Sequence, residues 1–182
     1  LLDVGPGDTV VVPSFGFVTT ALAYARQGAR ILFCDIDPDL LAMDPARLAS
    51  LMDDTVRAVV PIHYAGVACD LPGLRAVLAD HQRVNLIEDN AHGLFGRLDG
   101  RALGGFGRMS AVSFHATKSF TCGEGGALVL NDPADVDRAN TTKLELLDRF
   151  GKVIYVAYAP KASRGLSFVG VKTKADIWEV RI

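Results

Sequence analysis

The sequence predicts an α/β domain in which a mostly parallel sheet is covered by helices on both faces. Apolar, β-branched runs alternate with helical patterns at intervals of roughly 25 residues along much of the 182-residue chain, the rhythm of strand-helix-strand units. Several of the runs are apolar throughout, as expected of strands that are buried on both faces. Right-handed crossovers then place the C-terminal ends of the parallel strands at one edge of the sheet, where ligands bind in open α/β folds.

Each element is expected where a periodic run is bounded by turn or capping residues. Pro13 ends the first β-branched run, DTVVVPS, and Gly28 is a usual residue just past a helix end. Asp44 can cap a helix that has Pro45 at its first position, and a second Asp-Pro pair begins the last helix. We expect strands at 8–14, 30–37, 57–66, 84–91, 110–115 and 125–131, and helices at 18–28, 44–52, 71–81 and 132–150.

Composition disfavours several function classes. The net charge of −2 does not support a surface for nucleic acids, whose partners normally carry a basic excess. No apolar run reaches the roughly 18 residues that a membrane span needs, and no signal peptide is visible. The cysteines form no CxxC pair and the histidines no HExxH pattern, so we expect a reduced, cytoplasmic chain without a metal site.

Side chains capable of catalysis follow the predicted strands at the ligand-binding edge. Asp89 lies near the end of strand 84–91, and Lys118 follows strand 110–115 in AVSFHATKSFTCGEGGALVL. Because parallel strands end at the same edge, these two residues can meet, together with Phe17, His92 and Ser113. Each of the five also has an ordinary interpretation, such as a solvated lysine, a helix cap or a structural histidine.

The arrangement of these residues favours one chemistry. A lysine amine forms a Schiff base with the aldehyde of pyridoxal phosphate, and a buried carboxylate keeps the ring nitrogen of that cofactor protonated. Lys118 and Asp89 would take these roles, Phe17 could lie on the ring, and Ser113 could donate to the phosphate. Small residues after the lysine would let the backbone pass close to the ligand: Gly123, Gly125 and Gly126.

Three stretches resemble the nucleotide-sugar aminotransferases of the DegT/DnrJ/EryC1/StrS family: GPGDTVVVPSFGFVTTALAYARQGARILFCDID, PIHYAGVACD and LIEDNAHGLFGRLDGRALGGFGRMSAVSFHATKSFTCGEGGALVLND. The resemblance covers residues 1 to about 139 and implies the aspartate aminotransferase fold. It assigns 1–139 to a partial large domain that binds pyridoxal phosphate, and leaves 140–182 as a helix continuation and a divergent tail. HYAGVACD and TKSFTCGEGGALVLND are most similar to dTDP-4-amino-4,6-dideoxygalactose transaminases of bacterial surface polysaccharide synthesis.

The resemblance also implies a role for each candidate residue. Lys118 matches the Schiff-base lysine, and Asp89 matches the acid at the pyridine nitrogen. His92 lies where the family has Gln or His near the phenolic oxygen of the cofactor. Ser113 matches a phosphate donor, and Phe17 matches the aromatic residue that stacks on the ring. A homodimer is implied, whose active site borrows residues from the partner chain.

We therefore expect an aminotransferase that moves an amino group, with glutamate as the donor, to a nucleotide-linked 4-keto-6-deoxy sugar. Family members carry a phosphate-binding Gly-Ser/Thr-x-Ala turn that would precede Leu1, so a truncated, non-catalytic remnant is the alternative. Lys118 argues against the relatives that dehydrate the sugar, because these have histidine in its place. A Rossmann dinucleotide binder is disfavoured because no GxGxxG follows the first strand.

Overall fold

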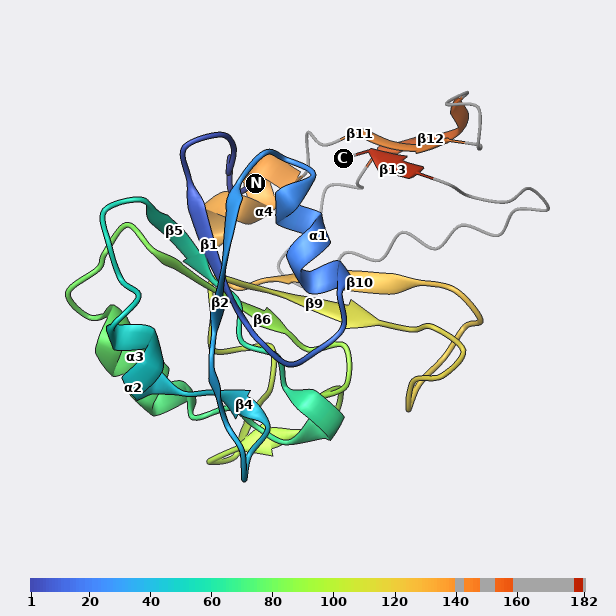
Figure 1. Cartoon of the computed structure of the whole chain (residues 1–182). Coiled ribbons are helices and arrows are strands. Elements are labelled where there is room, and N and C mark those ends of the chain that lie inside the picture. Colours follow the sequence, from blue (N-terminus) through green and yellow to red (C-terminus); the bar gives the residue numbers. More distant parts are fainter. Residues whose placement is uncertain (140–142, 148–152, 159–178, 182) are drawn as a thin grey trace.

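The computed structural model describes residues 1–139, 143–147, 153–158 and 179–181. Its main element is a six-stranded sheet in the order β10-β9-β6-β5-β1-β2 (Figure 1). Neighbouring strands are parallel except for β10, which is antiparallel to β9. The mostly parallel α/β architecture is thus confirmed. The strands of this sheet are β1 (Thr9–Pro13), β2 (Arg30–Cys34), β5 (Val56–Val59), β6 (Asn85–Asp89), β9 (Met109–Ser113) and β10 (Gly126–Leu130).

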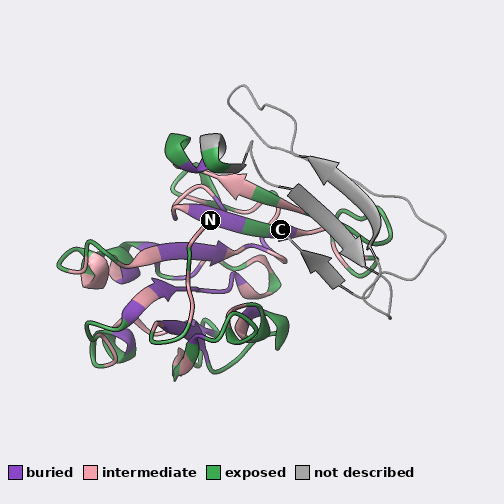
Figure 2. Ribbon diagram, turned by 90° about the horizontal axis from the view of Figure 1, so that it is seen from above, coloured by how far each residue is buried: buried purple, intermediate pink, exposed green. Residues whose placement is uncertain are grey.

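Helices cover both faces of the sheet, and β1 shows how alternation along a strand divides the core. Val11 packs in a cluster with residues of α2 (Pro45–Ala49) and α3 (Leu71–Leu78). Val10 and Val12 point to the opposite face, where Ala21 and Tyr24 of α1 (Thr19–Ala25) pack. Buried residues accordingly concentrate on the central strands, between the two helical layers (Figure 2).

The predicted helix start at Asp44 is confirmed, whereas α1 ends at Ala25 with Arg26 as its C-cap, short of the predicted end at Gly28. Asp44 accepts a hydrogen bond from the backbone N–H of Ala46 at 2.8 Å, and Pro45 begins α2. Gly28, just past α1, has φ of +88°, a conformation that residues with a side chain rarely adopt. These local signals mark where α2 begins and where the chain turns between α1 and β2.

Two predicted strands are shorter than expected. The strand predicted at 30–37 is divided into β2 and β3 (Ile36–Asp37), which forms a hairpin with β4 (Ala42–Met43). The Asp37 side chain makes the turn by accepting from the backbone N–H groups of Asp39 and Leu40. The strand predicted at 57–66 ends at Val59, and Tyr64–Gly66 forms a 3₁₀ turn. A small hairpin that the sequence did not indicate is formed by β7 (Arg97–Leu98) and β8 (Arg101–Ala102).

The helix predicted at 132–150 is wrong in its second half. α4 (Pro133–Ala139) is followed by β11 (Lys143–Leu147), which pairs with β12 (Val153–Tyr158) and β13 (Glu179–Arg181). The segment Lys-Leu-Glu-Leu alternates charged and apolar residues with a period of two, which suits a strand better than a helix. Most of the predicted divergent tail lies outside the described residues. No helix within the described ranges is long and apolar enough to span a bilayer.

Candidate active site

Asp89 lies at the C-terminal end of β6 with both carboxylate oxygens engaged. Its Oδ2 accepts a hydrogen bond from the Thr20 hydroxyl at 2.5 Å, and its Oδ1 accepts from the backbone N–H of Ala91 at 3.1 Å. β6 is held between β5 and β9, so the backbone that carries this carboxylate belongs to the centre of the sheet. The half-buried side chain is therefore fixed from two sides before any ligand arrives.

Asp89 and Ser113 line one cavity of about 230 Å³ on the α1 side of the sheet. Apolar wall residues, including Val60 and Ile87, lower the local polarity around the carboxylate. The wall also carries the hydroxyl groups of Thr19, Thr20, Tyr24 and Ser113. A few polar side chains in a largely apolar wall are the pattern of a small-molecule site.

Lys118 and His92 line a second cavity, of about 190 Å³, together with Ala65, Thr117 and Ser119. His92 Nδ1 accepts a hydrogen bond from the backbone N–H of Ala65 at 3.2 Å, so the proton of the neutral ring is on Nε2. Burial lowers the pKa of His92, the positive charge of Lys118 lowers it further, and the negative charge of Asp89 opposes both. His92 is therefore neutral at pH 7 and lies within electrostatic reach of the lysine and the aspartate.

The two cavities adjoin at the turn that follows β6. Ala91 lines the cavity of Asp89, and the next residue, His92, lines the cavity of Lys118. The structure thus brings four of the five predicted residues to one edge of the sheet, as the parallel topology requires.

Phe17 is the predicted residue that lies outside both cavities. The residue is 71% exposed, although its carbonyl accepts from the N–H of Thr20 and so begins α1. The glycines after Lys118 also differ from expectation, because none lines either cavity. A side chain at Gly126 would meet the Val112 carbonyl on β9 at 2.7 Å, so this glycine is explained by strand pairing.

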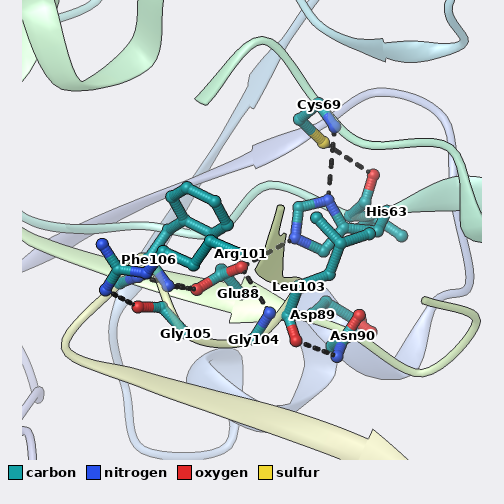
Figure 3. Close-up of polar contacts among 12 residues, drawn as sticks. His63, Cys69, Glu88, Asp89, Asn90, Arg101, Leu103, Gly104, Gly105 and Phe106 are labelled. Carbon is teal, nitrogen blue, oxygen red and sulfur yellow. Dashed lines mark hydrogen bonds and ion pairs between the residues drawn. The ribbon is translucent and has the colours of Figure 1, made fainter. Parts of the chain in front are cut away.

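A buried carboxylate that the sequence analysis missed lies directly before Asp89. Glu88 is fully buried and accepts from the backbone N–H groups of Gly104 and Phe106 at 2.7 and 2.6 Å (Figure 3). It also accepts from the backbone N–H of Gly107 at 2.6 Å. Its fourth partner is His63 Nε2, at 2.9 Å. Burial alone would raise the pKa of Glu88, but these four donors outweigh it and lower the pKa.

His63 connects this carboxylate to the segment between β5 and the 3₁₀ turn Tyr64–Gly66. Its Nδ1 accepts from the backbone N–H of Cys69 at 3.3 Å, so Nε2 carries the proton that is donated to Glu88 (Figure 3). Burial, followed by the charge of Glu88, raises the pKa of the Cys69 thiol to about 12. Cys69, His63 and Glu88 therefore form a structural chain and not a nucleophilic triad, because the thiol remains protonated.

The sequence profile of the DegT/DnrJ/EryC1/StrS aminotransferase family matches residues 1–174. This chain belongs to that family. The match continues past residue 139, where we had expected the resemblance to end. It confirms the family that the motifs around Asp89 and Lys118 indicated.

This chain matches only part of the length of three similar proteins. The spore coat polysaccharide biosynthesis protein SpsC of Bacillus subtilis (strain 168) is 36% identical over 141 residues, which are 78% of this chain and 36% of SpsC. DesI, solved in the presence of its TDP-sugar product, is 38% identical with a TM-score of 0.66, covering 70% of this chain and 32% of DesI. A Streptococcus pneumoniae protein solved in its PLP form is 28% identical with a TM-score of 0.70, covering 75% of this chain and 39% of that protein. The chain spans about a third of the length of these relatives.

The side chains present in this family member fit pyridoxal phosphate. The carboxylate of Asp89 faces a cavity with apolar walls, where it can pair with a protonated ring nitrogen. The adjoining cavity presents the Lys118 amine, which can bond to an aldehyde, and the Ser113 hydroxyl can donate to a phosphate. Asp89, Lys118 and Ser113 are thus complementary to the ring nitrogen, the aldehyde and the phosphate of that molecule.

Thr20 and Tyr24 are site residues that the sequence analysis missed. Both line the cavity of Asp89, and Tyr24 has its pKa raised to about 12 by burial and by the charge of Asp89. The helical spacing of Ala21 and Tyr24 could have indicated which face of α1 meets the sheet, and Thr20 borders that face. What the sequence could not show is that this face lies over the end of β6.

Proposed function

We propose that this chain carries the catalytic centre of a pyridoxal phosphate-dependent aminotransferase that acts on a nucleotide-linked sugar. The observation that carries the proposal is the placement of the two cavities at consecutive residues of the turn after β6: Ala91 lines the cavity of Asp89, and His92 lines the cavity of Lys118. Family membership supports the same reaction class.

The proposed roles follow from the chemistry of each side chain. When bound, the cofactor supplies an aromatic ring that withdraws electrons from the substrate carbon bearing the amino group. Asp89 would keep a proton on the ring nitrogen. The Lys118 amine, once free, would take the proton from the substrate carbon and deliver it to the cofactor carbon that carried the aldehyde. His92, neutral with its proton on Nε2, can donate a hydrogen bond into the cavity that it shares with Lys118.

The proposed acceptor is a 4-keto-6-deoxy sugar linked to a nucleotide, and the proposed amino donor is glutamate. The TDP-sugar product of DesI and the polysaccharide role of SpsC support a sugar substrate. The motifs HYAGVACD and TKSFTCGEGGALVLND favour a dTDP-4-amino-4,6-dideoxygalactose transaminase. A cytoplasmic homodimer that serves surface polysaccharide or deoxysugar synthesis is the setting that we propose.

Covalent capture of the cofactor tests the central claim. The chain is incubated with pyridoxal phosphate and reduced with borohydride, and the peptide that carries the added mass is identified by mass spectrometry. We expect the adduct on Lys118 in the wild type and none at this position in Lys118→Ala or Lys118→Arg. The arginine variant is the matched control, because it keeps the positive charge beside His92 but has no amine that can form a Schiff base. A wild-type chain that binds no cofactor, or carries it on another lysine, would refute the proposal.

The substrate class needs a separate assay. Amino transfer from glutamate is followed with the keto sugar linked to dTDP and with the same sugar lacking the nucleotide. We expect 2-oxoglutarate to form only with the nucleotide-linked sugar. Cofactor capture without transfer to any nucleotide sugar would preserve the cofactor site and refute the substrate.

A further inference from the structure

We propose that Thr20 is a positioning residue that holds the Asp89 carboxylate in place for the ring nitrogen of the cofactor. This inference rests on the proposed function and adds a residue for which the sequence motifs give no role. Its basis is the hydrogen bond from the Thr20 hydroxyl to Oδ2 of Asp89, at 2.5 Å, between residues that are distant in the sequence.

Thr20 is well placed to orient another side chain because it is itself immobilised. It is 9% exposed and lies in the first turn of α1, where its backbone N–H donates to the Phe17 carbonyl. α1 packs on the sheet through Ala21 and Tyr24. The hydroxyl therefore reaches Asp89 from a rigid helix, and a threonine side chain loses little rotational freedom when it does so.

Two donors are needed to fix the plane of a carboxylate, since its terminal torsion is broad. The backbone N–H of Ala91, in the turn after β6, donates to Oδ1, and the hydroxyl of Thr20, on α1, donates to Oδ2. Each oxygen retains further acceptor capacity for a ligand in the cavity. Without the hydroxyl, Oδ2 loses its donor inside a largely apolar wall, and the carboxylate can turn about its terminal torsion. A ring N–H would then meet a carboxylate that is less well oriented.

Cofactor affinity in a double-mutant cycle tests this role. Dissociation constants for pyridoxal phosphate are measured by equilibrium dialysis for the wild type, Thr20→Val, Asp89→Asn and the double variant. We expect Thr20→Val to weaken binding roughly tenfold, the loss of one hydrogen bond to a charged group, and to have little further effect once Asp89 is replaced. Thr20→Ser, which keeps the hydroxyl, should bind within about threefold of the wild type.

Thr55→Val is the matched control. Thr55 also donates to an aspartate at 2.5 Å, Oδ1 of Asp53, but this pair is exposed and belongs to neither cavity. The control therefore removes a hydrogen bond of the same type and length, together with the contacts of the Thr55 hydroxyl to Thr9 and Arg30, without touching either cavity. Its affinity for the cofactor should equal that of the wild type.

A spectroscopic measurement separates positioning from a general loss of structure. With ¹⁵N-labelled cofactor, the chemical shift of the ring nitrogen should indicate a protonated ring in the wild type and in Thr20→Ser, and a shift toward the neutral ring in Thr20→Val. If the valine variant does not fold, the ring nitrogen shift is compared between Thr20→Ala and Thr20→Ser. We expect only the alanine variant to shift toward the neutral ring.

The outcomes distinguish this inference from the proposed function. An effect of Thr20→Val that matches Thr55→Val, or that persists undiminished in the Asp89→Asn background, would overturn the role of Thr20 and leave the cofactor site intact. A wild-type chain that binds no cofactor would refute the proposed function and this inference with it.

Discussion

Replacing Glu88 by glutamine should be among the most destabilising conservative changes in this chain. The carboxylate is fully buried and accepts four hydrogen bonds, two on each oxygen. Phe106 and Gly107 donate to Oε1, whereas His63 and Gly104 donate to Oε2. A glutamine can satisfy only the first pair, because its NH₂ group would face the other two donors.

The magnitude follows from those two lost bonds. A hydrogen bond to a charged group contributes about 1.5–3 kcal/mol, so losing two of them costs about 3–6 kcal/mol. Because a domain is stable by only about 5–15 kcal/mol, the Glu88→Gln variant should lose a large fraction of its free energy of unfolding.

Urea denaturation followed by circular dichroism measures the effect. With a typical slope of about 2 kcal/mol per M, a loss of about 4 kcal/mol lowers the midpoint by roughly 2 M. Glu124→Gln is the control, since Glu124 is 81% exposed and makes only a surface contact with His115. Its midpoint should hardly change.

Amide hydrogen exchange then locates the damage. In the wild type the N–H groups of Gly104, Phe106 and Gly107 should be protected by Glu88, and in Glu88→Gln the protection of Gly104 should fall first. A midpoint within about 0.5 M of the wild type, with Gly104 still protected, would show that Glu88 does not anchor this loop.

Three further predictions follow from burial and close contacts. Folding lowers the pKa of Glu88, so the contribution of its carboxylate to the free energy of unfolding is complete above the ordinary pKa of 4.5 and is lost as the pH falls below that value. The difference in urea midpoint between the wild type and Glu88→Gln should therefore shrink on acidification. Leu48→Ala should cost about 2–5 kcal/mol in urea denaturation, since Leu48 is fully buried between α2 and the sheet, and a smaller loss would show that the cavity collapses. Gly126→Ala should cost about 1–3 kcal/mol, because the new Cβ would lie 2.7 Å from the Val112 carbonyl, and unchanged exchange of the β10 amides would contradict this strain.

Much of the fold could be predicted because its signals are local. The Asp-Pro helix start at Asp44 and the glycine at Gly28 act within a few residues of the backbone that they control. The strand at Lys143–Leu147 was missed because short segments rich in Leu and Glu satisfy a helical pattern almost as well as a period of two. What decides between them is pairing with β12, which lies beyond the reach of a local pattern.

The candidate site likewise contains some residues that the sequence could indicate and others that it could not. Asp89 and Lys118 could be proposed because parallel strands deliver their end residues to one edge, whatever the details of packing. Thr20 and His63 could not, because their importance depends on which helix face or strand end lies opposite β6. The lining of the cavities, like the exposed position of Phe17, depends on loop geometry that short sequence patterns do not specify.

The two adjacent acids of β6 show how one strand supplies both stability and chemistry. Successive residues of a strand point to opposite faces, so Glu88 lies with Leu86 on the side of α2 and α3, while Asp89 lies with Ile87 on the side of α1. Glu88 has all of its charge compensated by donors within the chain, which leaves it no capacity to act on a ligand. Asp89 receives only two donors and faces a cavity, so its remaining charge is directed at whatever enters. Exchanging the two residues would change the length of each side chain by one methylene, so neither carboxylate would keep its present geometry with its donors. The order Glu-Asp at 88–89 therefore suits both the fold and the site.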